Sequence, residues 1–287
     1  LIDFNIVLNF EIKNATNYVG IISGDNIVSE FSLSKKNDLS IYASDFIKPN
    51  LIKTKQKIRE KLSRVAHAGG GYKGRTYSNS IDALTSNYDF YDLFEVDFSW
   101  TIDDHLVCIH DWQGRLKSVF SVDYNGPVSL DNFNKLNLKK VDEKKCTIYT
   151  LVNWLKKNPK ARIVTDVKKR NIEAMEFISK TYPNLKNRFI PQVYKPIEYF
   201  YAKKLGFYDI IWTLYAYRVS DEEILQNLRI MDLYGLTMPK NNAYRGLALK
   251  AKSETGVLSW VHTVNSYSEF EKLKNVGVNQ IYTIFLK

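Results

Sequence analysis

The sequence has no long hydrophobic run. Its apolar stretches fall well short of the ~20 residues that a membrane-spanning helix needs, which excludes a transmembrane helix. It has only two cysteines, Cys108 and Cys146, which are too few for a disulfide framework. Cys108 lies in the apolar run LVCI, where we expect a core residue. Zinc-finger spacing and aromatic RNA-binding motifs are also absent, so nucleic acid is not an expected partner.

Composition and charge indicate the class of protein and the kind of partner it binds. The chain has 287 residues, of which 45% are hydrophobic and 25% charged, as in globular proteins. Its net charge of +10 comes from basic residues spread along the chain, which predicts a phosphate-bearing substrate or peripheral contact with an anionic membrane surface. No secretory signal is visible. Because the chain opens at Leu1 rather than Met, we expect an upstream targeting segment to be missing and leave the compartment open.

The first sixty residues differ from the rest of the chain. Between Phe4 and Ile12, apolar residues alternate with mostly polar ones, which predicts a half-buried strand. The sequence SGDN at 23–26 predicts a turn, and NLIKTKQKIREKLS at 50–63 predicts a basic helix. We therefore expect residues 1–60 to form a small β-rich module with a connecting helix.

From residue 61 onward, short apolar runs alternate with segments of helical spacing such as TLVNWLKKNPK and YSEFEKLKNVG. This repetition predicts an α/β fold with a parallel sheet and helical crossovers, and a (β/α)8 TIM barrel fits the span 61–287. Nine runs compete for eight strand positions, so an open doubly wound sheet stays an alternative; GLTMP is the weakest of the nine. The runs are RVAHA, LFEVDFSW, HLVCIHD, ARIVTDVK, RFIPQVY, DIIWTLY, GLTMP, LSWVHTVN and QIYTIFL.

Charged residues occupy alternate positions in two of these runs. Glu95 and Asp97 share one face of their strand, as do Asp166 and Lys168 of theirs. Near the carboxyl ends of barrel strands, such side chains converge on one mouth. Three neighbouring carboxylates resist joint ionisation unless a cation neutralises them. Because Mg²⁺ and Ca²⁺ prefer oxygen ligands, the pattern predicts a divalent-cation site in this mouth.

Two of the four histidines end such runs. His67 precedes AGGG, where glycine lets backbone and substrate approach closely, and His110 ends HLVCIH. An imidazole ionises near working pH, so the pair can serve as general base and general acid. Asp111 either orients His110 or caps the turn. A lone histidine is more often structural, and Glu-x-Asp on a strand is more often a solvated face. The joint placement of these residues favours function over those ordinary roles.

The ordered motifs VAHAGG, FEVDFSWTIDDHLVCIHD, IVTDVK and VHTVN resemble those of the glycerophosphodiester phosphodiesterases over residues 61–287. The barrel of that family carries His-Arg-Gly, Glu-x-Asp, His-Asp, Glu-x-Lys and Trp-Thr-Val-Asn. The resemblance suggests a role for each matching residue. The residues are the acid/base pair His67 and His110, the metal ligands Glu95, Asp97 and Asp166, and the substrate-binding Lys168, Gln192 and His262.

The chain departs from the family pattern chiefly around the phosphate and the alcohol. The loss of the family's arginine after the first histidine removes a phosphate clamp. Asn79 is kept in SNSIDAL, where the family has Glu-Asn-Thr. The reaction class therefore transfers better than the substrate does. The replacements are Ala68 for arginine, Ser78 for glutamate, Asp166 for a longer glutamate, His262 for tryptophan, and Ile284 for an aspartate in the closing segment.

We therefore expect a metal-dependent phosphodiesterase of lipid metabolism, a phosphoric diester hydrolase that cleaves a glycerophosphodiester-like bond by His/His acid–base catalysis. Its expected substrate is a glycerophosphodiester or a phosphorylated glycan or lipid. Two alternatives stay open. One is an enzyme of surface glycan biosynthesis that transfers a phosphoryl group or processes a phosphodiester. The other is a protein that binds a phosphorylated glycan or a phospholipid without catalysis.

Overall fold

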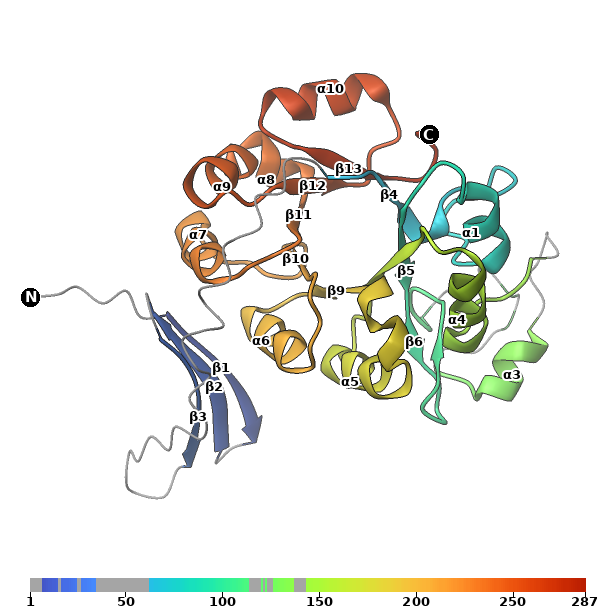
Figure 1. Ribbon diagram of the computed structural model, residues 1–287, viewed down its shortest axis with the longest axis horizontal. Coiled ribbons are helices and arrows are strands. Elements are labelled where there is room, and N and C mark those ends of the chain that lie inside the picture. Colours follow the sequence, from blue (N-terminus) through green and yellow to red (C-terminus); the bar gives the residue numbers. More distant parts are fainter. Residues whose placement is uncertain are drawn as a thin grey trace, which may run out of the picture.

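The computed structural model describes residues 7–14, 17–24, 27–34, 62–113, 120, 122, 126–136 and 143–287. Its main unit is a closed barrel with strand order β10-β11-β12-β13-β4-β5-β8-β9, and helices surround the strands (Figure 1). Neighbouring strands pair in parallel all the way round. This is the predicted (β/α)8 TIM barrel rather than an open sheet.

The bounds of the elements are as follows. The barrel strands are β4 (Val65–Ala66), β5 (Leu93–Asp97), β8 (Arg162–Asp166), β9 (Phe189–Val193), β10 (Ile211–Thr213), β11 (Gly235–Pro239), β12 (Ser259–His262) and β13 (Gln280–Thr283). The described helices are η2 (His67–Gly69), α1 (Ile81–Asn87), α3 (Leu130–Lys135), α4 (Ile148–Lys157), α5 (Asn171–Thr181), η3 (Pro183–Arg188), α6 (Pro196–Lys204), α7 (Asp221–Ile230), α8 (Lys240–Tyr244), α9 (Leu247–Thr255) and α10 (Tyr267–Asn275).

The two segments of helical spacing form helices as predicted, α4 and α10. Helix α4 begins with a capping box: the Thr147 hydroxyl accepts a hydrogen bond from the Thr150 N–H, and the Thr150 hydroxyl accepts one from the Thr147 N–H. Its apolar residues then face the barrel, with Ile148, Leu151 and Leu155 fully buried. None of the helices among the described residues has both the length and the apolar character needed to span a bilayer.

The barrel interior is apolar at one end and polar at the other. Leu93, Val164, Ile190 and Trp260 belong to one buried apolar cluster inside the strands. Further along the same strands, the inward positions become polar. The alternate residues, such as Phe94 and Val96, pack outward into the main core under the helices, as the period of two predicts. The carboxyl ends of the strands therefore hold a layer of polar side chains.

The run predicted to be weakest, GLTMP, is a barrel strand, β11, which pairs with β10 and β12. Gly235 is needed in this strand because Trp260 fills the interior beside it. A Cβ at Gly235 would lie 2.2 Å from Trp260 Cζ3. Of the nine runs, HLVCIHD at 105–111 is the one that forms no barrel strand. Only β7 (Leu106–Val107) is strand there, and it pairs with β6 (Ser99–Trp100) in a two-stranded antiparallel hairpin.

The two cysteines are joined by a disulfide, which the sequence interpretation missed. Cys108 and Cys146 lie 38 residues apart in the chain, with a Cα–Cα distance of 5.1 Å. Cys108 is also buried in the main core cluster, as predicted. One bond does not make a disulfide framework, but it connects the end of β7 to the start of α4.

Near the N-terminus, β1 (Val7–Asn14), β2 (Asn17–Gly24) and β3 (Ile27–Ser34) form a three-stranded antiparallel sheet that is not part of the barrel sheet. From Val7 onward, the strand expected at 4–12 agrees with β1. The turn predicted at 23–26 lies partly outside the described residues. The predicted connecting helix at 50–63 falls mostly outside the described residues. The division of the chain at residue 60 into two domains stays a prediction.

Candidate active site

Three carboxylates meet at the carboxyl ends of two neighbouring barrel strands. Glu95 and Asp97 come from β5 and Asp166 from β8, and the register pairs Asp97 directly with Asp166. All three are buried, and each offers an oxygen within 4.8 Å of the others' oxygens. The alternation read from the sequence therefore does bring these side chains together. A set of only carboxylate oxygens suits a hard divalent cation.

Glu95 has one satisfied oxygen and one orphan oxygen. Its Oε2 accepts a hydrogen bond of 2.6 Å from the Ala68 N–H, and His67 Nε2 lies 3.7 Å away from the same oxygen. Its Oε1 is buried without a hydrogen-bond partner. A buried carboxylate oxygen that has no donor is costly unless a cation accepts its lone pairs. This orphan oxygen is an observation that fits a metal ion at the cluster.

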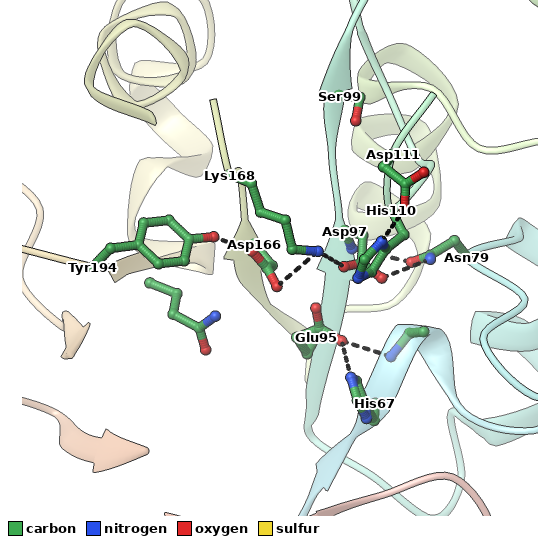
Figure 2. Close-up of polar contacts among 12 residues, drawn as sticks. His67, Asn79, Glu95, Asp97, Ser99, His110, Asp111, Asp166, Lys168 and Tyr194 are labelled. Carbon is green, nitrogen blue, oxygen red and sulfur yellow. Dashed lines mark hydrogen bonds and ion pairs between the residues drawn. The ribbon is translucent and has the colours of Figure 1, made fainter. Parts of the chain in front are cut away.

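Asp97 is held by an amide and an ammonium group. Asn79 Nδ2 donates to Asp97 Oδ2 at 2.9 Å, while the Asp97 N–H donates to Asn79 Oδ1 at 3.0 Å. Lys168 Nζ lies 3.3 Å from Asp97 Oδ1 and 3.8 Å from Asp166 Oδ2, between the two carboxylates (Figure 2). Asn79 thus fixes the rotamer of Asp97, and Lys168 partly neutralises the cluster.

Asp166 receives a short hydrogen bond from the hydroxyl of Tyr194, which follows β9 directly. Figure 2 shows this ring approaching Asp166 from the side opposite Asp97. The sequence interpretation did not single out Tyr194. Tyr194 shares a face of its run with Gln192, two positions earlier, and this alternation is the signal that could have found it.

The crowding of negative charge appears in the ionisation of the three acids. Burial, followed by the charges of Asp97 and Asp166, raises the pKa of Glu95 well above its ordinary value. Burial and the charge of Asp97 raise the pKa of Asp166 to about 6. Burial is the largest single effect on Asp97 and opposes its ionisation, but the charge of Lys168, the charge of His110 and the hydrogen bond from Asn79 together outweigh burial and lower the pKa of that carboxyl. Full ionisation of the cluster at neutral pH therefore calls for more positive charge than Lys168 supplies.

His67 lies just after β4 and is oriented by a hydroxyl group. Its Nδ1 is 2.5 Å from Thr263 Oγ1, a partner 196 residues away in the chain. Burial lowers the pKa of His67 to about 4, and the opposing effect of the Asp97 charge is smaller. The ring is therefore neutral at neutral pH. Thr263 belongs to the VHTVN motif, although its contact with His67 was not predicted.

His110 is oriented by a carboxylate instead. Its Nδ1 lies 2.5 Å from Asp111 Oδ2, so Asp111 contacts the ring rather than only capping the turn. A carboxylate accepts hydrogen bonds only, so Nδ1 carries a proton and proton exchange with a ligand falls to Nε2. His110 stands across the carboxylate cluster from His67 (Figure 2).

These groups line one cavity of about 450 Å³. Its far side carries uncharged polar and aromatic groups, among them Thr213, Tyr215 and Tyr282. His262 belongs to that side: its Nδ1 is 3.0 Å from Thr237 Oγ1, and burial lowers its pKa to about 4. Thr213 Oγ1 is buried there without a hydrogen-bond partner.

Every residue predicted for the site lines this cavity, and their individual roles stay predictions. Among the described residues that line it, Lys168 carries the only ammonium or guanidinium group. His105, the fourth histidine, is not in the cavity lining and lies 2.6 Å from Tyr149 OH through its Nδ1. The predicted residues are His67, Glu95, Asp97, His110, Asp166, Lys168, Gln192 and His262.

No family model matches the chain, and no curated protein matches it. Solved structures do match. A glycerophosphodiester phosphodiesterase from Parabacteroides distasonis is similar with a TM-score of 0.61 and 19% identity, covering 77% of this chain and 92% of that one. One from Thermotoga maritima has a TM-score of 0.61 and 18% identity, covering 78% and 95%.

A phosphodiesterase from Oleispira antarctica, solved in complex with the product sn-glycerol-3-phosphate, has a TM-score of 0.59 and 16% identity, covering 78% of this chain and 94% of that one. At these identities, the similarity establishes a shared fold. The resemblance seen in the motifs of this chain is thus matched by a resemblance in its barrel.

Proposed function

We propose that this barrel, which has the fold of glycerophosphodiester phosphodiesterases, is a metal-dependent phosphodiesterase that acts on a glycerophosphodiester-like substrate. One observation carries the proposal: two imidazoles face three buried carboxylates across a single cavity of about 450 Å³. An acid, a base and a cation-binding cluster are the groups that phosphodiester cleavage uses.

Glu95, Asp97 and Asp166 would hold the cation, because their oxygens are close together and Glu95 Oε1 has no other partner. When bound, Mg²⁺ or Ca²⁺ would neutralise the cluster and stabilise the negative charge that builds up on the phosphate in the transition state. Asn79 and Tyr194 then act as positioning residues, since each holds one carboxylate by a hydrogen bond.

The two histidines differ in a way that suits a division of labour. His67 is neutral and can take the proton of the attacking hydroxyl group as it forms its bond to phosphorus. His110, backed by Asp111, can give a proton to the alkoxide as the bond between phosphorus and the leaving oxygen breaks. The attacking group is either water or a neighbouring hydroxyl of the substrate. Attack by the substrate hydroxyl gives a cyclic phosphate.

The phosphate contact falls to Lys168, at 3.3 Å from Asp97. The family's arginine has no counterpart, because Ala68 stands at its position; Ala68 is fully buried, and its N–H donates to Glu95. On the other side of the cavity, Gln192 and His262 can contact the remainder of the substrate. A single lysine orients a phosphate less strictly than an arginine fork does.

The test is a turnover screen with and without Mg²⁺ or Ca²⁺ over glycerophosphodiesters and lysophospholipids, with the released alcohol and phosphate product identified. Metal-dependent turnover that is lost in His110→Ala is the expected result. Adding a sugar acceptor separates hydrolysis from transfer, because only a transferase forms a phosphorylated sugar. Absence of turnover across the panel, with tight binding of a phosphodiester, would favour the binding protein instead.

A further inference from the structure

His110 is held by a different part of the molecule from the other site residues. Glu95, Asp97 and Asp166 lie on barrel strands, which are fixed by the closed ladder of hydrogen bonds. His110 lies beyond the two-residue strand β7, and β7 pairs with β6 outside the barrel sheet. The barrel ladder therefore fixes the carboxylates without fixing His110.

Two side-chain hydrogen bonds tie the segment that carries His110 to its own hairpin. Ser99 Oγ donates to the Ile109 carbonyl at 3.0 Å, and Trp112 Nε1 donates to the Trp100 carbonyl at 2.9 Å. Ser99 and Trp100 are strand β6, the other arm of that hairpin. These hydrogen bonds shape the hairpin. Noncovalent contacts also join the segment to the helical layer: Val107 forms an isolated β-bridge with Thr147, and Ile109 packs in an apolar cluster with Phe133 of α3.

The disulfide adds a covalent anchor to these contacts. Cys108 stands two positions before His110, and Cys146 stands one position before Thr147, the N-cap of α4. The Cys108 N–H also donates to the Cys146 carbonyl at 2.9 Å. Because α4 packs its apolar face into the core, the covalent bond connects the histidine to a rigid element. Without the disulfide, the segment is held to α4 and α3 by noncovalent contacts, which are far easier to break than the disulfide.

On the basis of the proposed function, we infer that the Cys108–Cys146 disulfide positions His110 against the carboxylate cluster, and that turnover depends on the redox state of this bond. A dithiol reductant would attack one sulfur through its thiolate, form a mixed disulfide and then close its own disulfide. Two electrons and two protons pass to the protein, which is left with two thiols. Activity would then be full in oxidising surroundings and low where thiol reductants prevail.

Access to the bond is restricted. The exposed fractions of Cys108 and Cys146 are 6% and 1%, and the two residues line a cavity of about 30 Å³ beside His110. That volume admits a water molecule but no dithiol. Reduction therefore requires local opening of the hairpin and is expected to be slow in the folded protein.

The experiment compares the full chain in its oxidised form, after long incubation with dithiothreitol, and as Cys108→Ser and Cys146→Ser. The substrate is the phosphodiester with the highest turnover in the screen. We expect reduction and either variant to lower kcat by on the order of 10-fold to 100-fold through misplacement of His110. KM and Mg²⁺ affinity should stay within ~3-fold, because the barrel carboxylates do not move. Circular dichroism confirms that each form is folded.

Two controls isolate positioning from general destabilisation. Dithiothreitol should have no effect on either serine variant, and reoxidation should restore the wild type. In His110→Ala, reduction should cause no further loss of residual turnover, since the positioned group is already absent. Equal kcat in both redox states of the wild type would overturn the inference.

Absence of turnover in the oxidised protein counts against the proposed function and not against the positioning. In that case, imidazole NMR decides, because the chain has only four histidines. The signals of His110 should change on reduction while those of His67 and His262, which are held by the barrel, stay in place. Unchanged His110 signals would defeat the inference on their own.

Discussion

At the scale of single residues, the main feature of the site is its excess of negative charge. Glu95, Asp97 and Asp166 are all buried, and Lys168 supplies one positive charge among them. Acids in such a cluster hold protons that they would release in water, as the raised pKa values of Glu95 and Asp166 indicate. A divalent cation would displace those protons. The affinity of the cluster for that cation is therefore the most direct property to measure.

Replacing Asp97 by Asn should weaken Mg²⁺ or Ca²⁺ binding by at least ~10-fold and abolish turnover, because one charged ligand is lost. Isothermal titration calorimetry on the metal-free protein measures the affinity. The matched control is Asp92→Asn, an exposed carboxylate just before the same strand. It should bind the cation as the wild type does. An unchanged affinity in Asp97→Asn would refute the assignment of this ligand.

Replacing either His67 or His110 by Ala should lower the rate of the chemical step by on the order of 10²-fold or more, with little loss of substrate binding. The two losses should not add, since each proton transfer depends on the other. Single-turnover kinetics measure the step, and the wild-type pH profile should be bell-shaped. His105→Ala is the control outside the cavity and should be nearly silent, whereas His262→Ala should alter KM or substrate preference. Full turnover in His67→Ala would disprove the mechanism.

Stability against pH tests the burial of His262. Its pKa is about 4 in the folded protein and 6.5 ordinarily, so between these values the unfolded chain binds a proton that the folded one does not. Above pH 6.5 the neutral His262 ring costs no free energy of unfolding, and the protein loses stability as the pH falls from 6.5 to 4, because only the unfolded chain then binds the proton. Urea unfolding should show that His262→Gln loses less stability over this range than the wild type, by up to ~1.4 kcal/mol per pH unit. Parallel curves would mean that His262 is not buried as a neutral ring.

At the scale of elements, the barrel strands show how side-chain size decides what a pattern can reveal. Strand β11 contains Gly235 because the ring of Trp260 fills the interior against it, and Trp260 Nε1 is fastened to the Ser63 carbonyl at 2.9 Å. A glycine in a strand looks like a break when the neighbouring strand is unknown. In this barrel, Gly235 leaves the space that the Trp260 ring occupies.

Gly235→Ala should therefore destabilise the barrel by about 1–3 kcal/mol, because the new methyl group overlaps the Trp260 ring. Urea denaturation measures the loss. In combination with Trp260→Phe, which makes room for the methyl group, the loss should be less than the sum of the two single losses. Additive losses would show that the tryptophan ring is not what excludes a side chain at position 235.

At the scale of the whole molecule, all residues proposed for the site lie in the barrel. The three-stranded sheet β1–β2–β3 supplies none of them. The domain boundary predicted at residue 60 precedes Leu62, which is buried in the interior cluster of the barrel. A chain that begins at Lys61 should thus contain the whole barrel core and the whole site.

We expect such a chain, 61–287, to fold cooperatively and to bind Mg²⁺ or Ca²⁺ with the affinity of the full chain. Thermal unfolding by circular dichroism and calorimetric titration measure the two properties. Turnover of small phosphodiesters should also persist, whereas a loss confined to the native substrate would assign the N-terminal module to substrate guidance. Failure to fold or to bind the cation would contradict the boundary.

The sequence by itself determined what depends on local periodicity. Alternation placed Glu95 and Asp97 on one face with Phe94 and Val96 on the other, and helical spacing predicted α4 and α10. The order of short strands and helices indicated the barrel. Both follow from backbone geometry, because a strand repeats every two residues and a helix every 3.6 on average.

Only the tertiary structure decided which distant groups meet. It excluded β7 from the barrel, joined Cys108 to Cys146 across 38 residues, and brought Thr263 to His67 across 196. Periodicity describes the direction in which a side chain leaves its own element, and contains no information about which element faces it. That choice is made when the eight strands close, since closure fixes every neighbour at once through packing and register.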